Sequence, residues 1–349
     1  MMWIYYVKIA IFTILATTLF VSLIRRLVLS FGILDFPDIE RKKHQKGTPL
    51  LGGVGIFIAF FLMLFYIKND ILSGNLETSH WLGVFVGSCF LMIGGFLDDK
   101  FKLKAKWQIV WPVLAAFSVI VGGVNIEKVT NPFGGTIDFG VGDFSFISSI
   151  FIFLWLLGMM YTTKLLDGVD GLVTGVTAIG AFVIFLFTMT TKYYQADIGI
   201  ASFVLFFCLL VFLIFNWYPA KIFLGEGGSL FLGFILGVLA VISGGKIAIA
   251  LLVMGIPIMD VIWIMTTRIK NKQNPFTFSD RKHLHFRLID LGFDQRKTVL
   301  FYYLSSTIFG LSALFLQSRG KFFAILLLIF IMMTIVISFN IFDKKNKNV

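Results

Sequence analysis

The chain has little charge, few histidines and almost no cysteine. Asp, Glu, Lys and Arg make up 14% of its 349 residues, against 58% for hydrophobic residues. A soluble domain carries about a quarter charged residues, so this composition excludes an ordinary soluble fold. The two cysteines, Cys89 and Cys208, lie inside apolar runs, and a disulfide framework is therefore not expected.

Long apolar runs recur along the whole sequence. A membrane-spanning helix needs about 20 mostly apolar residues. Eleven stretches meet this description: residues 3–24, 50–67, 80–97, 107–123, 147–163, 172–190, 197–216, 224–243, 246–267, 298–316 and 322–342. The first is too long for a signal-peptide core and lacks a small-residue cleavage site, so we expect it to stay attached. The sequence predicts an all-α polytopic integral membrane protein with one transmembrane domain over residues 1–349.

Lys and Arg gather on alternate loops, which predicts how the chain crosses the membrane. By the positive-inside rule, the loops near residues 25–46, 98–106 and 268–297 are cytoplasmic. The N-terminus is then outside and the C-terminus cytoplasmic. This arrangement accounts for much of the net charge of +11, and nucleic acid is not an expected partner. Outside the membrane, strand-like alternation around Asn-Pro-Phe-Gly-Gly within 124–145 predicts a short β-hairpin.

Two aspartates stand between apolar runs in Leu-Asp-Gly-Val-Asp-Gly-Leu, residues 166–172. On a helix, Asp167 and Asp170 would share a face. Gly168 and Gly171 leave room for a phosphate or a metal to approach the backbone. A polar loop with glycine turns is the alternative interpretation.

Other acids lie at the ends of predicted spans. Asp98 and Asp99 are neighbours, and on a helix they diverge by about 100°, so both reach one spot only if the helix ends there. Ordinary ion pairs are the alternative. Glu226 opens a span within Gly-Glu-Gly-Gly-Ser, where a helix N-terminus favours an anion and a carboxylate can hold a cation for it. A plain capping role is the alternative for Glu226.

Basic residues and glycines form a second kind of signal near the first cytoplasmic loop. Lys43 and His44 belong to a basic cluster at residues 41–46, which suits an anionic ligand or anionic lipid head groups. The glycines within 52–55 either pack helices closely or offer backbone N–H groups to a phosphate.

Two of the four histidines, His283 and His285, lie beside Arg287 in the largest cytoplasmic loop. The His-x-His spacing suits zinc, but no cysteine or third histidine lies nearby to complete such a site. Gripping a phosphate is the favoured role for histidines among arginines. Asp260 falls within a predicted span. Intramembrane acids are functional by default, and a buried structural hydrogen bond is the alternative.

Together these stretches resemble the polyprenyl-phosphate N-acetylhexosaminyl-1-phosphate transferases (glycosyltransferase family 4), closest to the undecaprenyl-phosphate GlcNAc-1-phosphate transferase branch. The resemblance covers nearly the whole chain and follows the family's motif order. It rests on Gly-Gly-Val-Gly at 52–55, Asp98-Asp99, Leu-Asp-Gly-Val-Asp-Gly-Leu at 166–172, Gly-Glu-Gly-Gly-Ser at 225–229 and His-Leu-His-Phe-Arg-Leu at 283–288.

The resemblance implies a reaction at the cytoplasmic face of the inner or plasma membrane. N-acetylhexosamine 1-phosphate, above all GlcNAc-1-phosphate, passes from a UDP-N-acetylhexosamine to undecaprenyl or another polyprenyl phosphate, and UMP is released. This is the first membrane step of a cell-envelope glycan such as teichoic acid or lipopolysaccharide in cell wall biogenesis. A phospho-MurNAc-pentapeptide substrate is the runner-up, and a transporter or non-catalytic scaffold is the rival class. A homodimer is compatible with the sequence.

The resemblance also implies roles for individual residues. Mg²⁺, with Mn²⁺ as the alternative, is expected on Glu226 and Asp167. Asp98 is the candidate general base or lipid-phosphate positioning residue, with Asp99 supporting the metal site.

The remaining roles concern substrate binding. We expect Asp170 to face the nucleotide and Lys164 to contact a phosphate. His283, His285 and Arg287 are expected to hold the diphosphate, and Lys43 and His44 are further candidates for binding an anionic substrate.

Three positions depart from the family pattern. Lys164 stands where the family usually has Asn, Glu226 where it has Asp, and Phe286 where it has a second adjacent His. Glu226 keeps the charge but adds a methylene, and Lys164 replaces a hydrogen-bonding amide with a cation. Every acidic charge survives, which favours coordinated drift in an active lineage over decay.

Overall fold

The computed structural model describes most of the chain as helix. The described residues are 2–35, 47–72, 77–126, 128–138, 144–190, 194–243, 246–273 and 282–347. The helices are α1 (Met2–Phe31), α2 (Gly52–Tyr66), α3 (Lys68–Ile71), α4 (Thr78–Phe101), α5 (Ala105–Gln108), α6 (Val110–Val121), α7 (Phe144–Leu166), α8 (Leu172–Thr188), α9 (Ala196–Asn216), α10 (Gly225–Ile242), α11 (Ile247–Val253), α12 (Gly255–Lys270), α13 (Leu284–Asp290), α14 (Gln295–Phe315) and α15 (Ser318–Lys347). The strands are β1 (Leu34–Asp35), β2 (Thr48–Pro49), β3 (Lys128–Thr130) and β4 (Thr136–Asp138).

The described helices have the length and composition of membrane spans. Seven of them are long and apolar enough to cross a bilayer, and α11 with α12 forms an eighth candidate that bends by 79°. Three shorter apolar helices, α2, α8 and the stretch Ala105–Val121, complete the set. Each of the eleven predicted spans coincides with one of these helices or pairs. The prediction of a polytopic membrane protein is confirmed, whereas the exact number of crossings and their direction stay predictions.

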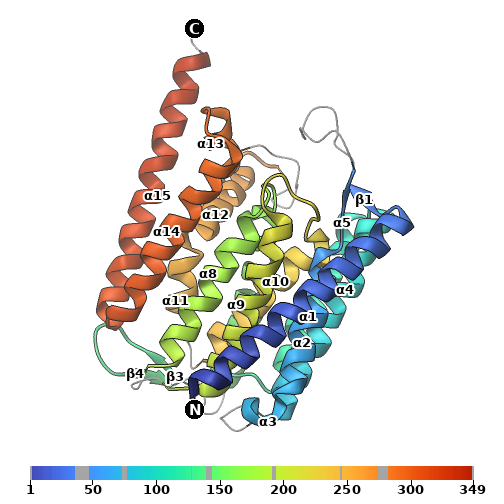
Figure 1. Ribbon diagram of the computed structural model, residues 1–349. Helices are drawn as coiled ribbons and strands as arrows, with labels where there is room; N and C mark the ends of the chain where they lie inside the picture. Colours follow the sequence, from blue (N-terminus) through green and yellow to red (C-terminus); the bar gives the residue numbers. More distant parts are fainter. Residues whose placement is uncertain are drawn as a thin grey trace.

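The helices form one bundle, with α1 and α15 on opposite sides of it (Figure 1). The N-terminus lies at one end of the bundle, and α13 and the C-terminus lie at the other. We call the end with α13 the motif end. Termini at opposite ends are what an odd number of crossings requires.

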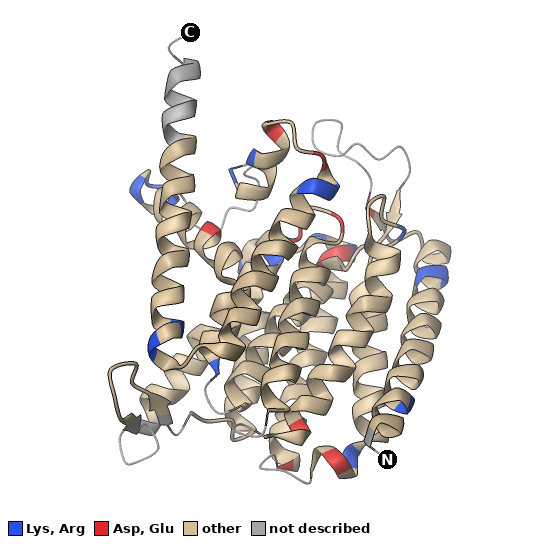
Figure 2. Ribbon diagram, turned by 60° about the vertical axis from the view of Figure 1, so that its left-hand side comes forward, with Lys and Arg blue, Asp and Glu red and all other residues tan. Residues whose placement is uncertain are grey.

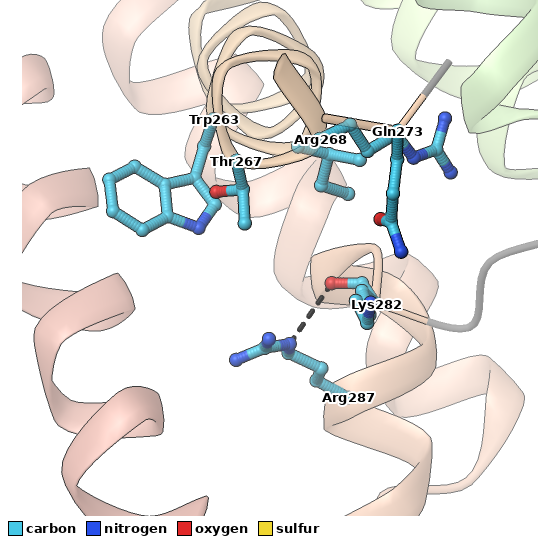
Figure 3. Close-up of a pocket in the computed structure, with 7 residues that line it drawn as sticks. Trp263, Thr267, Arg268, Gln273, Lys282 and Arg287 are labelled. Atoms are coloured by element: carbon cyan, nitrogen blue, oxygen red, sulfur yellow. Dashed lines mark hydrogen bonds between the residues drawn. The ribbon is translucent and has the colours of Figure 1, made fainter. Parts of the chain in front are cut away.

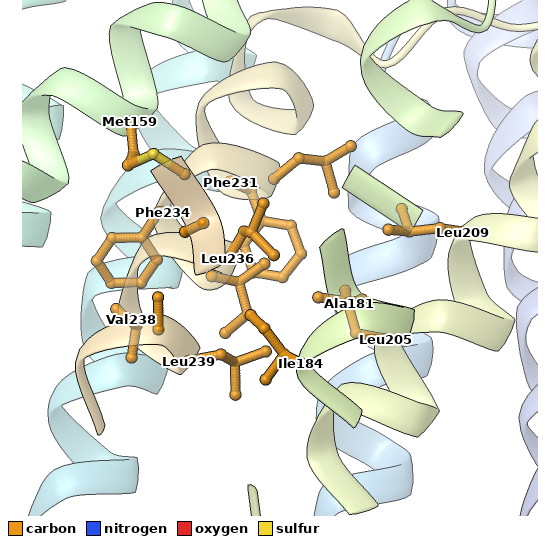
Figure 4. Packing of buried hydrophobic residues seen from close by; sticks show 14 of the residues in the cluster. Met159, Ala181, Ile184, Leu205, Leu209, Phe231, Phe234, Leu236, Val238 and Leu239 are labelled. Carbon is orange, nitrogen blue, oxygen red and sulfur yellow. The ribbon is translucent and has the colours of Figure 1, made fainter. Parts of the chain in front are cut away.

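Helix α10 forms the centre of the core. It packs against α7, α4, α2 and α8, and nearly all of its residues are buried. Phe231, Phe234 and Leu236 project from it toward neighbouring helices (Figure 4). Gly233 allows the closest approach, because a Cβ there would overlap the backbone of Met159 on α7. Small residues of this kind let helix backbones approach in a membrane, where apolar burial alone gives little drive to associate.

Glycines also join three helices at the motif end. A Cβ on Gly53 would overlap the Cα of Gly228, and a Cβ on Gly95 would overlap Gly227. The backbone N–H of Gly53 donates to the carbonyl of Leu224 at 2.9 Å. Gly53 therefore serves helix packing, and its N–H is already used within the fold.

A two-stranded hairpin lies at the end of the bundle opposite the motif end, which is also the end of the N-terminus (Figure 1). Strands β3 and β4 pair antiparallel, within the range where the sequence predicts a hairpin. Arg319 donates from Nε to the carbonyl of Pro132 and from Nη2 to that of Phe133, both at 3.1 Å. The hairpin is thus tied to the first turn of α15. Its placement outside the membrane stays a prediction.

A second pair, β1 with β2, was not expected from the sequence. The strands pair antiparallel over Leu34–Pro49 and Asp35–Thr48. Such two-residue pairings have no periodic sequence signal. The basic cluster predicted at residues 41–46, with Lys43 and His44, lies outside the described residues.

Candidate active site

Four acidic residues predicted for the site meet at the motif end. Asp98 and Asp99 lie in the last turn of α4, Asp167 follows α7, and Glu226 lies in the first turn of α10. Asp98, Asp167 and Glu226 all lie close enough to repel the charge of Asp99. Figure 2 shows acidic residues among the loops at this end of the bundle. The fold therefore brings together acids that are as much as 128 positions apart in the sequence.

Asp99 joins α4 to α10. The backbone N–H of Glu226 donates to both carboxylate oxygens of Asp99, at 3.2 and 3.1 Å. A carboxylate at this place satisfies a free N–H at the start of the helix and interacts favourably with its dipole. Gly225, with φ of +75°, makes room for it, since a Cβ there would lie 2.5 Å from Asp99 Oδ2. Asp99 thus fixes the position of the helix that carries Glu226.

Asp98 has different partners from its neighbour. Its Oδ1 accepts from the backbone N–H of Leu103 at 2.8 Å and from Nε2 of Gln108 at 3.0 Å. Lys102 ends α4 in a left-handed conformation with φ of 49°, and this reversal lets Leu103 reach back to Asp98. The two carboxylates diverge, as the helical geometry predicts.

Lys164 lies near the end of α7 and connects it to α10 and α5. Its Nζ contacts Oε1 of Glu226, and both side chains are largely buried. Nζ also donates to Oε1 of Gln108 at 3.2 Å and lies 6.0 Å from the ring centre of Tyr161. Two of the three departures from the family pattern, Lys164 and Glu226, therefore touch each other.

Gln108 was missed by the sequence analysis. It stands between a run of lysines and an apolar stretch, where a single glutamine carries no pattern. Its side chain bridges Asp98 and Lys164. No signal in the sequence could have identified it, because Asp98 and Lys164 approach Gln108 only in the folded structure.

The Asp-Gly-x-Asp-Gly stretch is a turn between α7 and α8. A helix that would place both aspartates on one face does not form there, because α7 ends at Leu166 and α8 begins only at Leu172, after the left-handed Gly171 with φ of +79°. Asp167 is exposed, whereas Asp170 is buried. Oδ2 of Asp170 accepts from the backbone N–H of Ala220 at 2.9 Å. This carboxylate secures the loop before α10.

Two further side chains fix the same turn. Asn216 Oδ1 accepts from the backbone N–H of Gly171 at 3.1 Å, and Tyr303 donates its hydroxyl to the Gly171 carbonyl at 2.6 Å. These bonds come from α9 and α14. The position of Asp167 is thereby set by helices distant in the sequence.

The histidine motif is held by Asp260. Oδ2 of Asp260 lies 2.8 Å from Nδ1 of His283, and Oδ1 accepts from the backbone N–H of Leu284 at 3.0 Å. Both oxygens of this buried acid are used to anchor the start of α13 on α12. The alternative of a buried structural hydrogen bond therefore describes Asp260. The bond also orients His283, because a ring whose Nδ1 faces a carboxylate presents Nε2 to its surroundings.

His285 is buried against the Asp-Gly turn. A Cβ on Gly168 would lie 2.8 Å from Nε2 of His285 and 2.8 Å from the ring of Phe286. The rings of His285 and His283 stack with centres 5.5 Å apart. Burial, with the nearby His283, lowers the pKa of His285 to about 3. His285 is therefore uncharged at neutral pH, and its ring nitrogens have no hydrogen-bond partner among the described residues.

A basic pocket of about 100 Å³ lies beside the histidine motif. Arg268, Lys282 and Arg287 line it together with four neutral residues, Trp263, Ile264, Thr267 and Gln273 (Figure 3). Arg287 donates from Nε to the carbonyl of Lys282 at 3.0 Å. The described lining contains three cations and no acid, which suits a phosphate group. Arg268 and Lys282 were not predicted as site residues.

The acid cluster fits a hard divalent cation. Mg²⁺ is bound through one or two carboxylates together with substrate phosphates, and the cluster offers oxygen donors from Asp167 and Glu226. Among the described residues, no group of three or more His, Cys, Asp and Glu side chains could enclose a metal without a substrate. The zinc alternative for His283 and His285 gains no third ligand there.

Fold and site together define a multi-pass membrane protein whose acidic and basic groups meet at one end of a helical bundle. The chain belongs to glycosyl transferase family 4: residues 81–244 match that family, and a relative 31% identical to it extends over 88% of the chain. This confirms the resemblance drawn from the motifs.

Three relatives show the branch of the family to which the chain is similar. A probable undecaprenyl-phosphate N-acetylglucosaminyl 1-phosphate transferase of Bacillus subtilis is 31% identical over 88% of this chain and 84% of its own. A decaprenyl-phosphate N-acetylglucosaminephosphotransferase of Mycolicibacterium smegmatis is 28% identical over 80% and 74%. An undecaprenyl-phosphate alpha-N-acetylglucosaminyl 1-phosphate transferase of Yersinia pestis is 26% identical over 86% and 81%.

Proposed function

We propose that the protein transfers GlcNAc-1-phosphate from UDP-GlcNAc to undecaprenyl phosphate or another polyprenyl phosphate. The observation that carries this proposal is the meeting of Asp98, Asp99, Asp167 and Glu226 at one end of a membrane bundle. The activities for which the three relatives are named support the same reaction.

The reaction joins two anions. An oxygen of the lipid phosphate attacks the β-phosphorus of UDP-GlcNAc, and the bond from that phosphorus to the bridging oxygen breaks. UMP leaves with the bridging oxygen, and the lipid becomes a polyprenyl diphospho-GlcNAc. Charge neutralisation and in-line positioning are the main tasks of the protein in such a step.

Glu226 and Asp167 are the proposed ligands of Mg²⁺, with Mn²⁺ as the alternative ion. When bound, the ion neutralises phosphate charge and polarises the phosphorus–oxygen bonds. Asp98 is proposed to position the lipid phosphate. A phosphomonoester has a second pKa near 6, so it is largely deprotonated at neutral pH and needs little help from a base.

The basic pocket and the histidines are proposed to hold the diphosphate. Arg268, Lys282 and Arg287 supply fixed positive charge at the pocket. His285, being uncharged, can donate or accept a hydrogen bond without adding charge. Phe286, packed on His285 with ring centres 4.3 Å apart, holds it against Gly168.

The proposal includes a location. The motif end is placed at the cytoplasmic face of the inner or plasma membrane, because the loops predicted to be cytoplasmic by their Lys and Arg content belong to it. The product would start a cell-envelope glycan.

A transfer assay tests the proposal. Purified protein in detergent is mixed with undecaprenyl phosphate, Mg²⁺ and radiolabelled UDP-GlcNAc, with UDP-GalNAc and UDP-MurNAc-pentapeptide in parallel. Label entering the lipid phase from UDP-GlcNAc, with equal release of UMP, is the expected result. Transfer from UDP-MurNAc-pentapeptide instead would favour the runner-up substrate. No transfer from any donor by folded, Mg²⁺-supplied protein would favour a transporter or scaffold.

A further inference from the structure

Gln108 occupies an unusual place between two charged side chains. Its Nε2 lies 3.0 Å from Oδ1 of Asp98, and its Oε1 lies 3.2 Å from Nζ of Lys164. Lys164 in turn contacts Oε1 of Glu226. The four side chains form a continuous chain of polar contacts across α4, α5, α7 and α10.

The chemistry of these neighbours fixes the orientation of the amide. An ionised carboxylate only accepts hydrogen bonds and an ammonium only donates them. The NH₂ group of Gln108 must therefore face Asp98, and its carbonyl oxygen must face Lys164. A third bond, from Nε2 to the carbonyl of Leu103 at 3.0 Å, holds the amide in this orientation. Rotating it would set oxygen against oxygen on one side and nitrogen against nitrogen on the other.

We propose that Gln108 is a positioning residue that couples Asp98 to the Lys164–Glu226 pair. It keeps the groups that face the lipid phosphate and those that face the diphosphate of UDP-GlcNAc in a fixed position relative to each other. This proposal rests on the proposed transfer reaction. Gln108 touches neither substrate in this role. It acts through Asp98 at the lipid phosphate and through Lys164 at the carboxylate of Glu226.

The position of Gln108 in the chain explains how it can do this. It ends the four-residue helix α5, directly after the reversal at Lys102 that brings Leu103 to Asp98. The loop is thus tied to Asp98 by both a main-chain and a side-chain donor. A shift of this loop would move Asp98 and Lys164 together, which is what coupling requires.

Two substitutions at Gln108 test whether both contacts are needed. Gln108→Leu keeps approximate side-chain volume and removes both polar contacts. Gln108→Glu keeps an acceptor for Lys164 but places a second carboxylate against Asp98. If the coupling of both partners matters, the two variants should lose activity to a similar extent.

The expected result is a change in kcat with little change in KM. We expect Gln108→Leu and Gln108→Glu each to lower kcat by about 10- to 100-fold, the size of a lost hydrogen bond to a charged group. KM for UDP-GlcNAc should change by less than about threefold, because Gln108 itself does not contact the donor. Gln317→Leu, an exposed glutamine at the opposite end, is the matched control and should retain wild-type kinetics.

A double-mutant cycle tests the coupling directly. Lys164→Met, Gln108→Leu and the double variant are compared by kcat and by thermal midpoint in detergent. Coupled residues give effects that do not add, so the double variant should lie within about twofold of the worse single variant in kcat. Additive losses in both measurements would overturn the proposal, as would a kcat of Gln108→Leu within about twofold of wild type.

The thermal cycle separates this proposal from the proposed function. If wild-type protein transferred nothing, the reaction would be wrong, and the catalytic role of Gln108 would be overturned with it. Non-additive thermal midpoints would then still establish the physical link between Gln108 and Lys164. Active wild-type protein with additive midpoints and additive kcat losses would overturn the coupling alone.

Discussion

Two buried carboxylates at the motif end are paired with basic side chains, and the pairs differ in what surrounds them. Glu226 contacts Lys164, whose ammonium also donates to Gln108 in the acid cluster. Asp260 faces His283 with one oxygen and accepts a backbone N–H with the other. Asp260 thus fixes the start of α13 in place. The carboxylate of Glu226 is instead paired with the side-chain ammonium of Lys164.

The same distinction separates the other acids. Asp99 and Asp170 each accept a backbone N–H from a segment distant in the sequence. Such bonds fix the positions of α10 and the loop before it. Neighbouring aspartates of one motif, such as Asp98 and Asp99, therefore have different structural roles, and their hydrogen-bond partners distinguish these roles.

The largest effect is expected from removing charge in the acid cluster. Asp167→Asn and Glu226→Gln should each lower transfer by about 10³-fold or more, because a charge aligned with the reacting phosphates is lost. The thermal midpoint of Asp167→Asn should stay within about 3 °C of wild type, because this exposed side chain keeps its shape. UMP release and a thermal scan measure both. Wild-type rates in either variant would remove that residue from the catalytic set.

A substitution at Asp260 is expected to lower both the stability of the protein and its transfer activity. Asp260→Asn places an NH₂ group or a weaker acceptor where His283 and Leu284 now find a carboxylate. We expect a loss of about 1–3 kcal/mol in stability and about a tenfold loss in transfer, because His283 is no longer oriented. Measuring both on one sample sharpens the comparison with Glu226→Gln. Equal loss of activity without any loss of stability would place Asp260 in the same functional class as Glu226.

A smaller effect is expected from His285, on the pH dependence of the free energy of unfolding. Its pKa is lowered from 6.5 to about 3 in the fold, so below pH 6.5 the unfolded chain takes up a proton that the folded protein does not. The stabilising contribution is complete above pH 6.5 and is lost as the pH falls from there toward 3. The slope is at most about 1.4 kcal/mol per pH unit.

The control for this pH dependence is His285→Phe. Its thermal midpoint should change less between pH 7 and pH 5 than that of wild type, because the titrating ring is absent. Parallel profiles of the two proteins across this range would show that His285 is protonated as easily in the fold as in the unfolded chain.

The smallest effect is expected at the opposite end of the bundle. Arg319→Met removes two exposed hydrogen bonds to the hairpin carbonyls, and a loss of about 1 kcal/mol in stability should follow. Transfer should stay within about twofold of wild type, because the hairpin and the acid cluster lie at different ends. A tenfold loss of transfer at unchanged stability would contradict this separation.

Sequence patterns were sufficient to predict the apolar spans and the motif acids. Span length follows from hydrophobicity alone, and acids followed by glycines stand out in a chain with little charge. The prediction that Asp167 and Asp170 share a helical face was wrong, because both lie in the turn between the end of α7 at Leu166 and the start of α8 at Leu172. The roles of the individual site residues stay predictions.

The missing information concerned contacts between distant segments. Lys164 meets Gln108 and Glu226 only because α5, α7 and α10 end at the same place. Likewise, His283, the partner of Asp260, lies 23 residues further along the chain. The periodicity of a single helix carries no information about contacts between distant segments. These pairings could therefore be found only from the three-dimensional structure.

The glycine contacts at the motif end limit how this site can vary. Gly53 with Gly228 and Gly95 with Gly227 leave no space between the three backbones, so the main chain cannot shift to accommodate a longer side chain. Any change in the length of an acid must be matched by a change in another side chain. Substitutions at this end of the bundle are therefore tolerated in pairs of contacting side chains. Glu226, one methylene longer than the Asp of the family pattern, and its partner Lys164 form such a pair.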